Sequence, residues 1–119
     1  MNLINLSDNI FIAGHKGMVG SALCKELKEK GYQNILKASR TELDLRNEYS
    51  VKKWFKENKP TVVIIAAAKV GGIYANEFYP ADFILDNLKI QNNLIEHSWK
   101  SNVKRLLFLG SSCIYPKFS

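Results

Sequence analysis

The chain has 119 residues, of which 46% are hydrophobic, 11% aromatic and 24% charged, and its formal net charge is +6. This length allows one domain, and the composition excludes a disordered chain and a disulfide-rich secreted scaffold. The longest apolar run, residues 62–68, is far shorter than the roughly 20 residues that a membrane-spanning helix needs. Residues 1–9 contain no Lys or Arg and no long apolar core, so we expect a cytoplasmic protein with no membrane partner.

The excess of 17 Lys and Arg over 11 Asp and Glu does not by itself indicate a nucleic-acid partner. Basic residues are dispersed and often adjoin glutamates, as in residues 25–30, whereas nucleic-acid binding needs a basic patch. We therefore expect no nucleic-acid partner and favour a small anionic ligand. Cys24 and Cys113 have no metal-ligand spacing, which predicts free thiols and no metal site.

Short apolar runs alternate with longer amphipathic ones, which is the rhythm of an α/β domain. Strands are expected at residues 10–13, 34–38, 61–66 and 105–109, and helices at residues 18–30, 47–58 and 81–101. Right-handed crossovers then predict a Rossmann-like doubly wound parallel sheet with strand order 3-2-1-4, truncated after the fourth strand. The strand at 61–66 lacks alternation, which is typical of a strand buried on both faces near the sheet centre.

Each expected helix carries apolar residues at helical spacing on one face, and we expect those of the second helix to pack against the sheet. They are Val19, Ala22, Leu23 and Leu27 in the first helix, Val51, Trp54 and Phe55 in the second, and Ile84, Leu88, Ile95 and Trp99 in the third. Gly31 stands where the C-cap of the first helix belongs.

A glycine pattern, Gly14, Gly17 and Gly20, joins the first strand to the first helix. In this context a GxxGxxG sequence lets a pyrophosphate approach backbone N–H groups at the helix N-terminus, where partial positive charge collects. The alternative is a plain strand-to-helix turn. The candidate phosphate loop comprises Gly14, His15, Lys16, Gly17, Met18, Val19 and Gly20.

The end of the second strand indicates which dinucleotide binds. A NAD-binding domain places Asp or Glu there for the ribose 2′-hydroxyl, but residues 37–40 contain no acid. Arg40, twenty positions after Gly20, suits a bidentate contact to a 2′-phosphate. The sequence therefore favours NADP(H), the alternative being that Arg40 is a solvated turn residue.

Three stretches carry a family resemblance that covers essentially the whole chain. They are FIAGHKGMVGSA at residues 11–22, AAAKVGGI at residues 66–73 and FLGSSCIYPK at residues 108–117. Together they resemble GDP-L-fucose synthases, a family of extended short-chain dehydrogenase/reductases. The resemblance implies NADPH-dependent conversion of GDP-4-keto-6-deoxy-D-mannose to GDP-L-fucose, by epimerisation at C3 and C5 followed by reduction of the ketone.

The resemblance also implies roles for individual residues. Ser111 would hydrogen-bond the 4-keto oxygen, and Cys113 would be an acid/base of the epimerisation. Asp44 and Leu45 would flank the adenine, and Asn87 and Asn93 match paired positions that we interpret as structural. The remaining cofactor contacts implied are Ala66, Ala67, Ala68, Leu109, Gly110, Ser111 and Ser112.

The chain lacks parts that this family uses. Its Tyr-x-x-x-Lys pair lies beyond the serine motif, and Tyr49 to Lys53 matches that spacing only on a helix before the third strand. We therefore expect residues 1–119 to be the NAD(P)-binding N-terminal part of a longer epimerase/reductase, without its C-terminal substrate domain and inactive alone. Alternatives are a non-catalytic NADP(H)-sensing module, or part of a reductase for another GDP-4-keto sugar such as a heptose. A GDP-sugar and a second copy in a homodimer are the expected partners.

Overall fold

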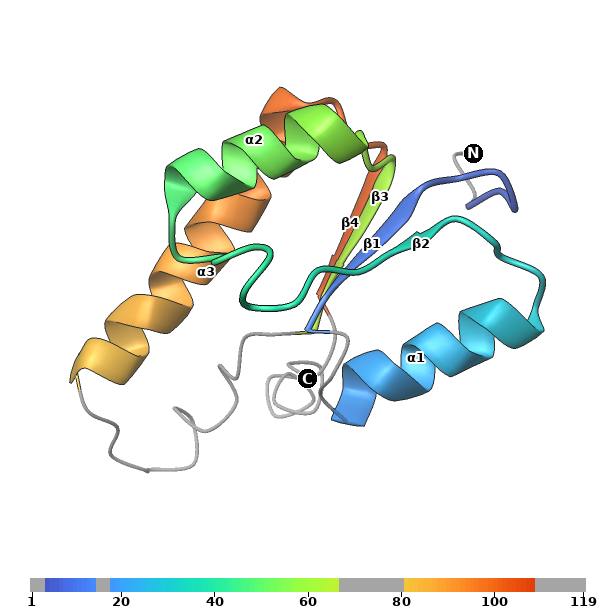
Figure 1. Ribbon diagram of the computed structural model, residues 1–119, viewed down its shortest axis with the longest axis horizontal. Helices are drawn as coiled ribbons and strands as arrows, with labels where there is room; N and C mark the ends of the chain where they lie inside the picture. Colours follow the sequence, from blue (N-terminus) through green and yellow to red (C-terminus); the bar gives the residue numbers. More distant parts are fainter. Residues whose placement is uncertain (1–3, 15–17, 67–80, 109–119) are drawn as a thin grey trace, which may run out of the picture.

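The computed structural model describes residues 4–14, 18–66 and 81–108, apart from the side chains of Met18 and Phe83. The elements, in chain order, are β1 (Ile10–Ala13), α1 (Met18–Glu29), β2 (Ile35–Leu36), α2 (Glu48–Asn58), β3 (Val62–Ile65), α3 (Ala81–Lys100) and β4 (Arg105–Phe108). The four strands form one parallel sheet, with α1 on one side and α2 and α3 together on the other (Figure 1). The expected class, a Rossmann-like doubly wound sheet, is confirmed.

The order of the strands within the sheet is β2-β1-β3-β4. The expected 3-2-1-4 order put the third strand outside β2, whereas β3 lies between β1 and β4. All four β3 side chains are at most 3% exposed, and an edge position would have left them partly in water. The edge is taken instead by β2, which is two residues long and only half-buried. The winding therefore reverses one strand earlier than expected.

Alternation along β1 and β3 divides the core between the two faces of the sheet. Phe11, Ala13, Val63 and Ile65 point to the side of α2 and α3, where Val51, Phe55 and Leu94 meet them. Ile10, Ile12, Val62 and Ile64 point to the side of α1, against Leu23 and Leu27. The predicted second-helix face is confirmed, and Trp54 stacks on Phe11 with ring centroids 4.1 Å apart.

Local signals set the ends of the helices. α1 ends at Glu29 and is followed by Gly31, whose φ of +97° favours glycine, and the Tyr32 N–H donates back to the Leu27 carbonyl. α2 begins at the N-cap Asn47, whose side chain accepts from the Ser50 N–H at 3.0 Å. No helix in the described part of the chain is both long and apolar enough to cross a membrane.

The apolar stripe expected on α3 is not the buried face of the helix. Leu88, Ile95 and Trp99 are 50%, 40% and 77% exposed, while Leu94 and His97 on another face of the helix are buried. The buried face of α3 carries both apolar and polar side chains. It packs on α2 and on the segment before α2, where the Leu45 carbonyl accepts from Asn93. In α1, Val19 is likewise 43% exposed, unlike its predicted neighbours Leu23 and Leu27.

The buried Asp8 links the strands at the edge of the sheet where their amino ends lie. Its Oδ1 accepts from the Thr61 hydroxyl at 2.9 Å, and its Oδ2 accepts from the Asn5 N–H at 2.7 Å and pairs with Lys104 Nζ at 2.8 Å. Burial raises the pKa of Asp8, but the hydrogen bonds from Lys104, Asn5 and Thr61 lower this pKa by more. The net direction is downward, so the carboxylate joins the starts of β1, β3 and β4 as an anion.

We predict that Asp8→Asn lowers the free energy of unfolding at pH 7 by about 1–3 kcal/mol, because a buried charged acceptor of several hydrogen bonds is lost. Since the folded-state pKa is lowered, the stabilisation is full above the unfolded-state pKa of about 4 and is lost as the pH falls through the folded-state value. Urea unfolding at pH 7 and pH 3 measures this, with the exposed Glu57→Gln as control. A difference between wild type and Asp8→Asn that does not narrow at pH 3 would contradict the prediction.

Candidate functional site

The carboxyl ends of the parallel strands, where open α/β sheets bind ligands, bring some of the predicted residues together. Gly14 follows β1 with a φ of +94°, a conformation that favours glycine. Ala66 follows β3, and its N–H donates to the Ala13 carbonyl at 2.8 Å, which sets Ala66 next to the start of the glycine turn. Gly20 is buried within α1. The predicted residues His15, Lys16, Gly17, Ala67, Ala68, Leu109, Gly110, Ser111, Ser112 and Cys113 lie outside the described residues.

Residues 39–47, the 39–47 loop, run from the end of β2 to the N-cap of α2. The loop opens with a reciprocal pair of bonds in which the Ser39 N–H donates to Glu42 Oε1 at 2.9 Å and the Glu42 N–H donates to Ser39 Oγ at 3.4 Å. This is the capping-box arrangement of a single helical turn, closed by the Leu43 N–H on the Ser39 carbonyl. Glu42, the acid nearest to the end of β2, thus turns its carboxylate to the backbone of its own turn.

Arg40 stands exposed in that turn. Its guanidinium makes no hydrogen bond or ion pair with any residue that the structure describes. The Ser39 and Thr41 hydroxyls beside it are 2.9 Å apart. A guanidinium without a described hydrogen-bond partner, next to two hydroxyls and with the local carboxylate turned inward, suits an anionic group. The Glu42 carboxylate is not directed outward to accept from a ribose diol.

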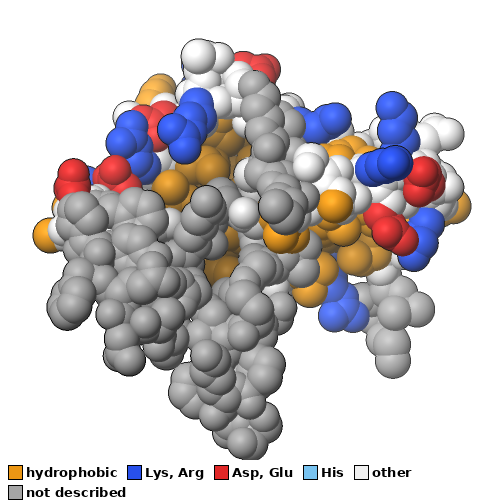
Figure 2. Space-filling view, turned by 90° about the horizontal axis from the view of Figure 1, so that it is seen from below, with side chains coloured by type: hydrophobic (Ala, Val, Ile, Leu, Met, Phe, Trp, Pro, Cys, Tyr) orange, Lys and Arg blue, Asp and Glu red, His pale blue; other side chains and the backbone are white. Residues whose placement is uncertain are grey.

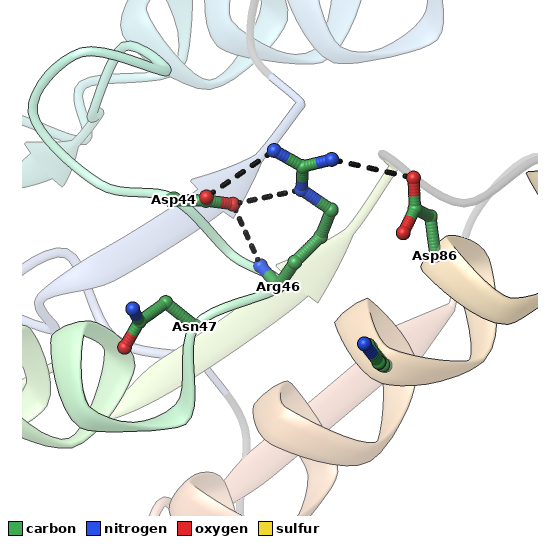
Figure 3. A pocket seen from close by; sticks show the side chains of 5 residues that line it. Asp44, Arg46, Asn47 and Asp86 are labelled. Carbon is green, nitrogen blue, oxygen red and sulfur yellow. Dashed lines mark hydrogen bonds and ion pairs between the residues drawn. The ribbon is translucent and has the colours of Figure 1, made fainter. Parts of the chain in front are cut away.

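A second arginine in the loop is held between two carboxylates. Arg46 binds Asp44 through Nε at 3.1 Å and through its own backbone N–H at 3.0 Å, and its Nη1 reaches Asp86 on α3 at 3.3 Å. Figure 3 shows the guanidinium lying between the two acids. The side chain and backbone N–H of Arg46 hold the pKa of Asp44 below its usual value, and the charge of Arg40 adds to this. Asp44 is therefore an anion oriented by Arg46.

The next residue, Leu45, is fixed through its backbone. Asn93 of α3 is buried, and its Nδ2 donates to the Leu45 carbonyl at 2.9 Å. Leu43 is 3% exposed in the core, and Leu45 packs at the rim of the same cluster. The loop is thus anchored by side chains below it and by α3 beside it.

Sequence reasoning missed three of these residues. Glu42 had a readable signal, since Ser-x-x-Glu is the signature of a capping box. Arg46 and Asp86 had none, because they are 40 positions apart and meet only when α3 packs beside the loop. Asn93 was expected to be structural, and its bond to Leu45 gives that role a specific partner.

The surface at this end of the sheet is mixed in charge. In the view from below, Lys and Arg side chains of the described residues are interspersed with Asp and Glu (Figure 2). Within residues 4–14, 18–66 and 81–108, no three His, Cys, Asp or Glu side chains gather closely enough to hold a metal ion.

A glycine turn between the first strand and helix of a doubly wound parallel sheet defines a nucleotide-binding α/β protein of the Rossmann type. The sequence model of one such family, the NAD dependent epimerase/dehydratase family, matches residues 10–119. The chain belongs to this family.

Curated relatives narrow the similarity. GDP-L-fucose synthase 1 of Arabidopsis thaliana is 55% identical over 113 residues, which are 95% of this chain and 35% of that protein. GDP-L-fucose synthase of Escherichia coli K12 is 48% identical over 110 residues, 92% of this chain and 34% of that protein. The chain spans about a third of the length of these relatives.

Solved structures give the same picture. A GDP-mannoheptose C4 reductase from Campylobacter jejuni with NADP bound has a TM-score of 0.79 and 46% identity, over 88% of this chain and 33% of that one. A GDP-L-fucose synthetase from Naegleria fowleri bound to NADP has a TM-score of 0.73 and 26% identity, over 88% of this chain and 31% of that one. The described residues therefore have the fold of about a third of each of these two proteins.

Proposed function

We propose that this chain is the NADP(H)-binding segment of a cytoplasmic epimerase/reductase that converts GDP-4-keto-6-deoxy-D-mannose to GDP-L-fucose. The observation that carries the proposal is the identity of about half of the residues with GDP-L-fucose synthases along more than nine tenths of the chain. In this proposal residues 1–119 form one NAD(P)-binding domain, and a further C-terminal domain binds the sugar.

The residues at the carboxyl edge fit the proposed cofactor. Gly14 at positive φ leaves the space above the turn free of a Cβ for a pyrophosphate, and Ala66 is a small neighbour on the next strand. Arg40 has its guanidinium free for a 2′-phosphate, while Asp44 and Leu45 present the loop surface for the adenine. In a NAD(H)-binding domain an acid near this position would accept from the ribose 2′-hydroxyl. The carboxylate of Glu42 instead accepts from the Ser39 N–H, which favours NADP(H) over NAD(H).

We predict that Arg40→Ala raises the Kd for NADPH by about ten- to a hundredfold, because charge-assisted hydrogen bonds to a phosphate are lost. The Kd for NADH should change little. Titration of intrinsic Trp fluorescence measures both values, and Lys52→Ala on α2 is the matched control for loss of an exposed charge. Equal losses for both cofactors, or no loss for NADPH, would contradict the assignment of Arg40.

The chemistry proposed for the serine motif follows from the resemblance. When bound, NADPH supplies the hydride for reduction of the ketone. Ser111 donates a hydrogen bond to the 4-keto oxygen, which stabilises negative charge on that oxygen. Cys113 exchanges a proton with the carbon beside the ketone on one face of the sugar. A second acid/base, which this proposal assigns to the further C-terminal domain, exchanges the proton on the opposite face, so that the stereocentre inverts.

Two alternatives to this function are considered, one for the sugar and one for catalysis. The similarity to Campylobacter jejuni heptose reductases, at 46% identity and a TM-score of 0.79, supports a GDP-4-keto-heptose as the sugar. The second alternative is a non-catalytic module that binds or senses NADP(H), which the chimera described next tests.

A chimera separates the enzyme from the sensing module. We predict that the 119 residues alone bind NADPH and leave the ketosugar unchanged, whereas the chain joined to the remaining part of the E. coli synthase oxidises NADPH when GDP-4-keto-6-deoxy-D-mannose is added. Absorbance at the NADPH band measures turnover, and Ser111→Ala in the chimera is the negative control. A chimera that folds and binds NADPH without oxidising it would contradict the enzymatic proposal and favour the module.

We also propose that the protein forms a homodimer through α3. Four apolar side chains form an exposed stripe along this helix, namely Leu85, Leu88, Ile95 and Trp99. Exposed apolar side chains that line one face of a helix in this way suit an association site. A second copy presenting the same stripe would cover it by the self-complementary contact of a two-fold dimer.

We predict that Trp99→Glu weakens self-association, because it places a charge within the buried contact. Tyr49→Glu on α2 is the control, since Tyr49 is 74% exposed outside the stripe. Sedimentation equilibrium of the two variants and the wild type measures the dimer constant. A wild type that stays monomeric, or a Trp99→Glu variant that associates as strongly as wild type, would contradict the proposal.

A further inference from the structure

α3 reaches the 39–47 loop at two points. Asn93 Nδ2 donates to the Leu45 carbonyl at 2.9 Å, and Asp86 Oδ2 accepts from Arg46 Nη1 at 3.3 Å. The two α3 residues are seven positions apart, which is two helical turns, so they lie on one face of the helix. Leu45 and Arg46, which are neighbours in the loop, are therefore both held by α3.

The two contacts differ in strength. Asn93 is 9% exposed, and a buried amide that loses its acceptor, or a carbonyl that loses its donor, is costly. The Arg46 to Asp86 pair is half-exposed and contributes less, but the same guanidinium also orients the Asp44 carboxylate through Nε. Asn93 thus fixes the position of the Leu45 backbone, and Asp86 fixes the arginine that aims Asp44.

We propose that Asn93 and Asp86 are positioning residues for the adenosine half of the dinucleotide. They hold Leu45 and Asp44 in the places where the loop surface meets the adenine. This inference rests on the proposed function, in which these two loop residues flank the base. It adds that the geometry of the adenine site is set from α3, by residues that need not touch the cofactor.

Asn93→Asp tests the stronger contact at nearly constant side-chain size. A carboxylate cannot donate to the Leu45 carbonyl and repels it, so the loop backbone must move. We expect the Kd for 2′,5′-ADP, which contains the adenosine half and the 2′-phosphate, to rise roughly three- to tenfold, the loss of about one hydrogen bond. The Kd for reduced nicotinamide mononucleotide, which lacks that half, should stay within about twofold of wild type.

Asp86→Asn is the second variant, because it alters a half-exposed side chain and leaves the Asn93 contact in place. It should raise the Kd for 2′,5′-ADP by about two- to fivefold through the freed Arg46. Asn92→Asp is the control for a new charge at the neighbouring position, which is exposed on another face of α3. The control should bind both fragments as wild type does.

Isothermal titration of the full chain with each fragment gives three distinguishable results. If the wild type does not bind 2′,5′-ADP, the proposed function fails before the variants are measured. If the wild type binds 2′,5′-ADP and one of the two variants loses affinity only for this fragment, the positioning role is supported. If Asn93→Asp does not fold, Asp86→Asn decides the test alone. If the folded variants bind 2′,5′-ADP as wild type does, or lose both fragments equally as a general destabilisation would cause, the inference is overturned.

Discussion

The burial of β1 and β3 side by side at the centre of the sheet is the constraint from which the rest of the structure follows. Every side chain of these two strands is at most 3% exposed, which requires a helix layer on each face and a hydrogen-bonded neighbour on each edge. The register that pairs Ala13 with Ile65 makes the two strands end together. Gly14 and Ala66 therefore lie next to each other at the carboxyl edge, where open α/β sheets bind ligands and where these two residues add little side-chain bulk.

The 39–47 loop is the second part of the candidate site, and it depends on that core. Leu43 enters the core beside α2, which fixes the height of the loop above the sheet. The Ser39 and Glu42 box then gives the first turn its shape, and α3 holds Leu45 and Arg46. Unlike Arg46, Arg40 makes no hydrogen bond or ion pair with a described residue. Its guanidinium is therefore available to an anion.

Periodicity and turn chemistry were sufficient to predict the fold class and the elements to within a few residues, because those signals are local. The position of β3 beside β1 was not predicted, although its lack of alternation already indicated a central strand. The buried face of α3 was not predicted, because an apolar stripe indicates burial only when nothing polar competes, and Asn93 donates to the carbonyl of Leu45. The glycine turn and Arg40 could be found from spacing, whereas Arg46 and Asp86 meet through tertiary packing that spacing cannot reveal.

The central claim is that a phosphorylated dinucleotide binds across the carboxyl edge of this sheet, with its adenosine half on the 39–47 loop. Amide chemical shifts of the isotope-labelled chain, followed during titration with NADPH, test it most directly. The account predicts shifts at Gly14, at residues 39–45 and at Ala66, with none at Asp8, Thr61 and Lys104 on the opposite edge. Shifts confined to the amino edge, or no saturable shifts at any amide, would contradict it.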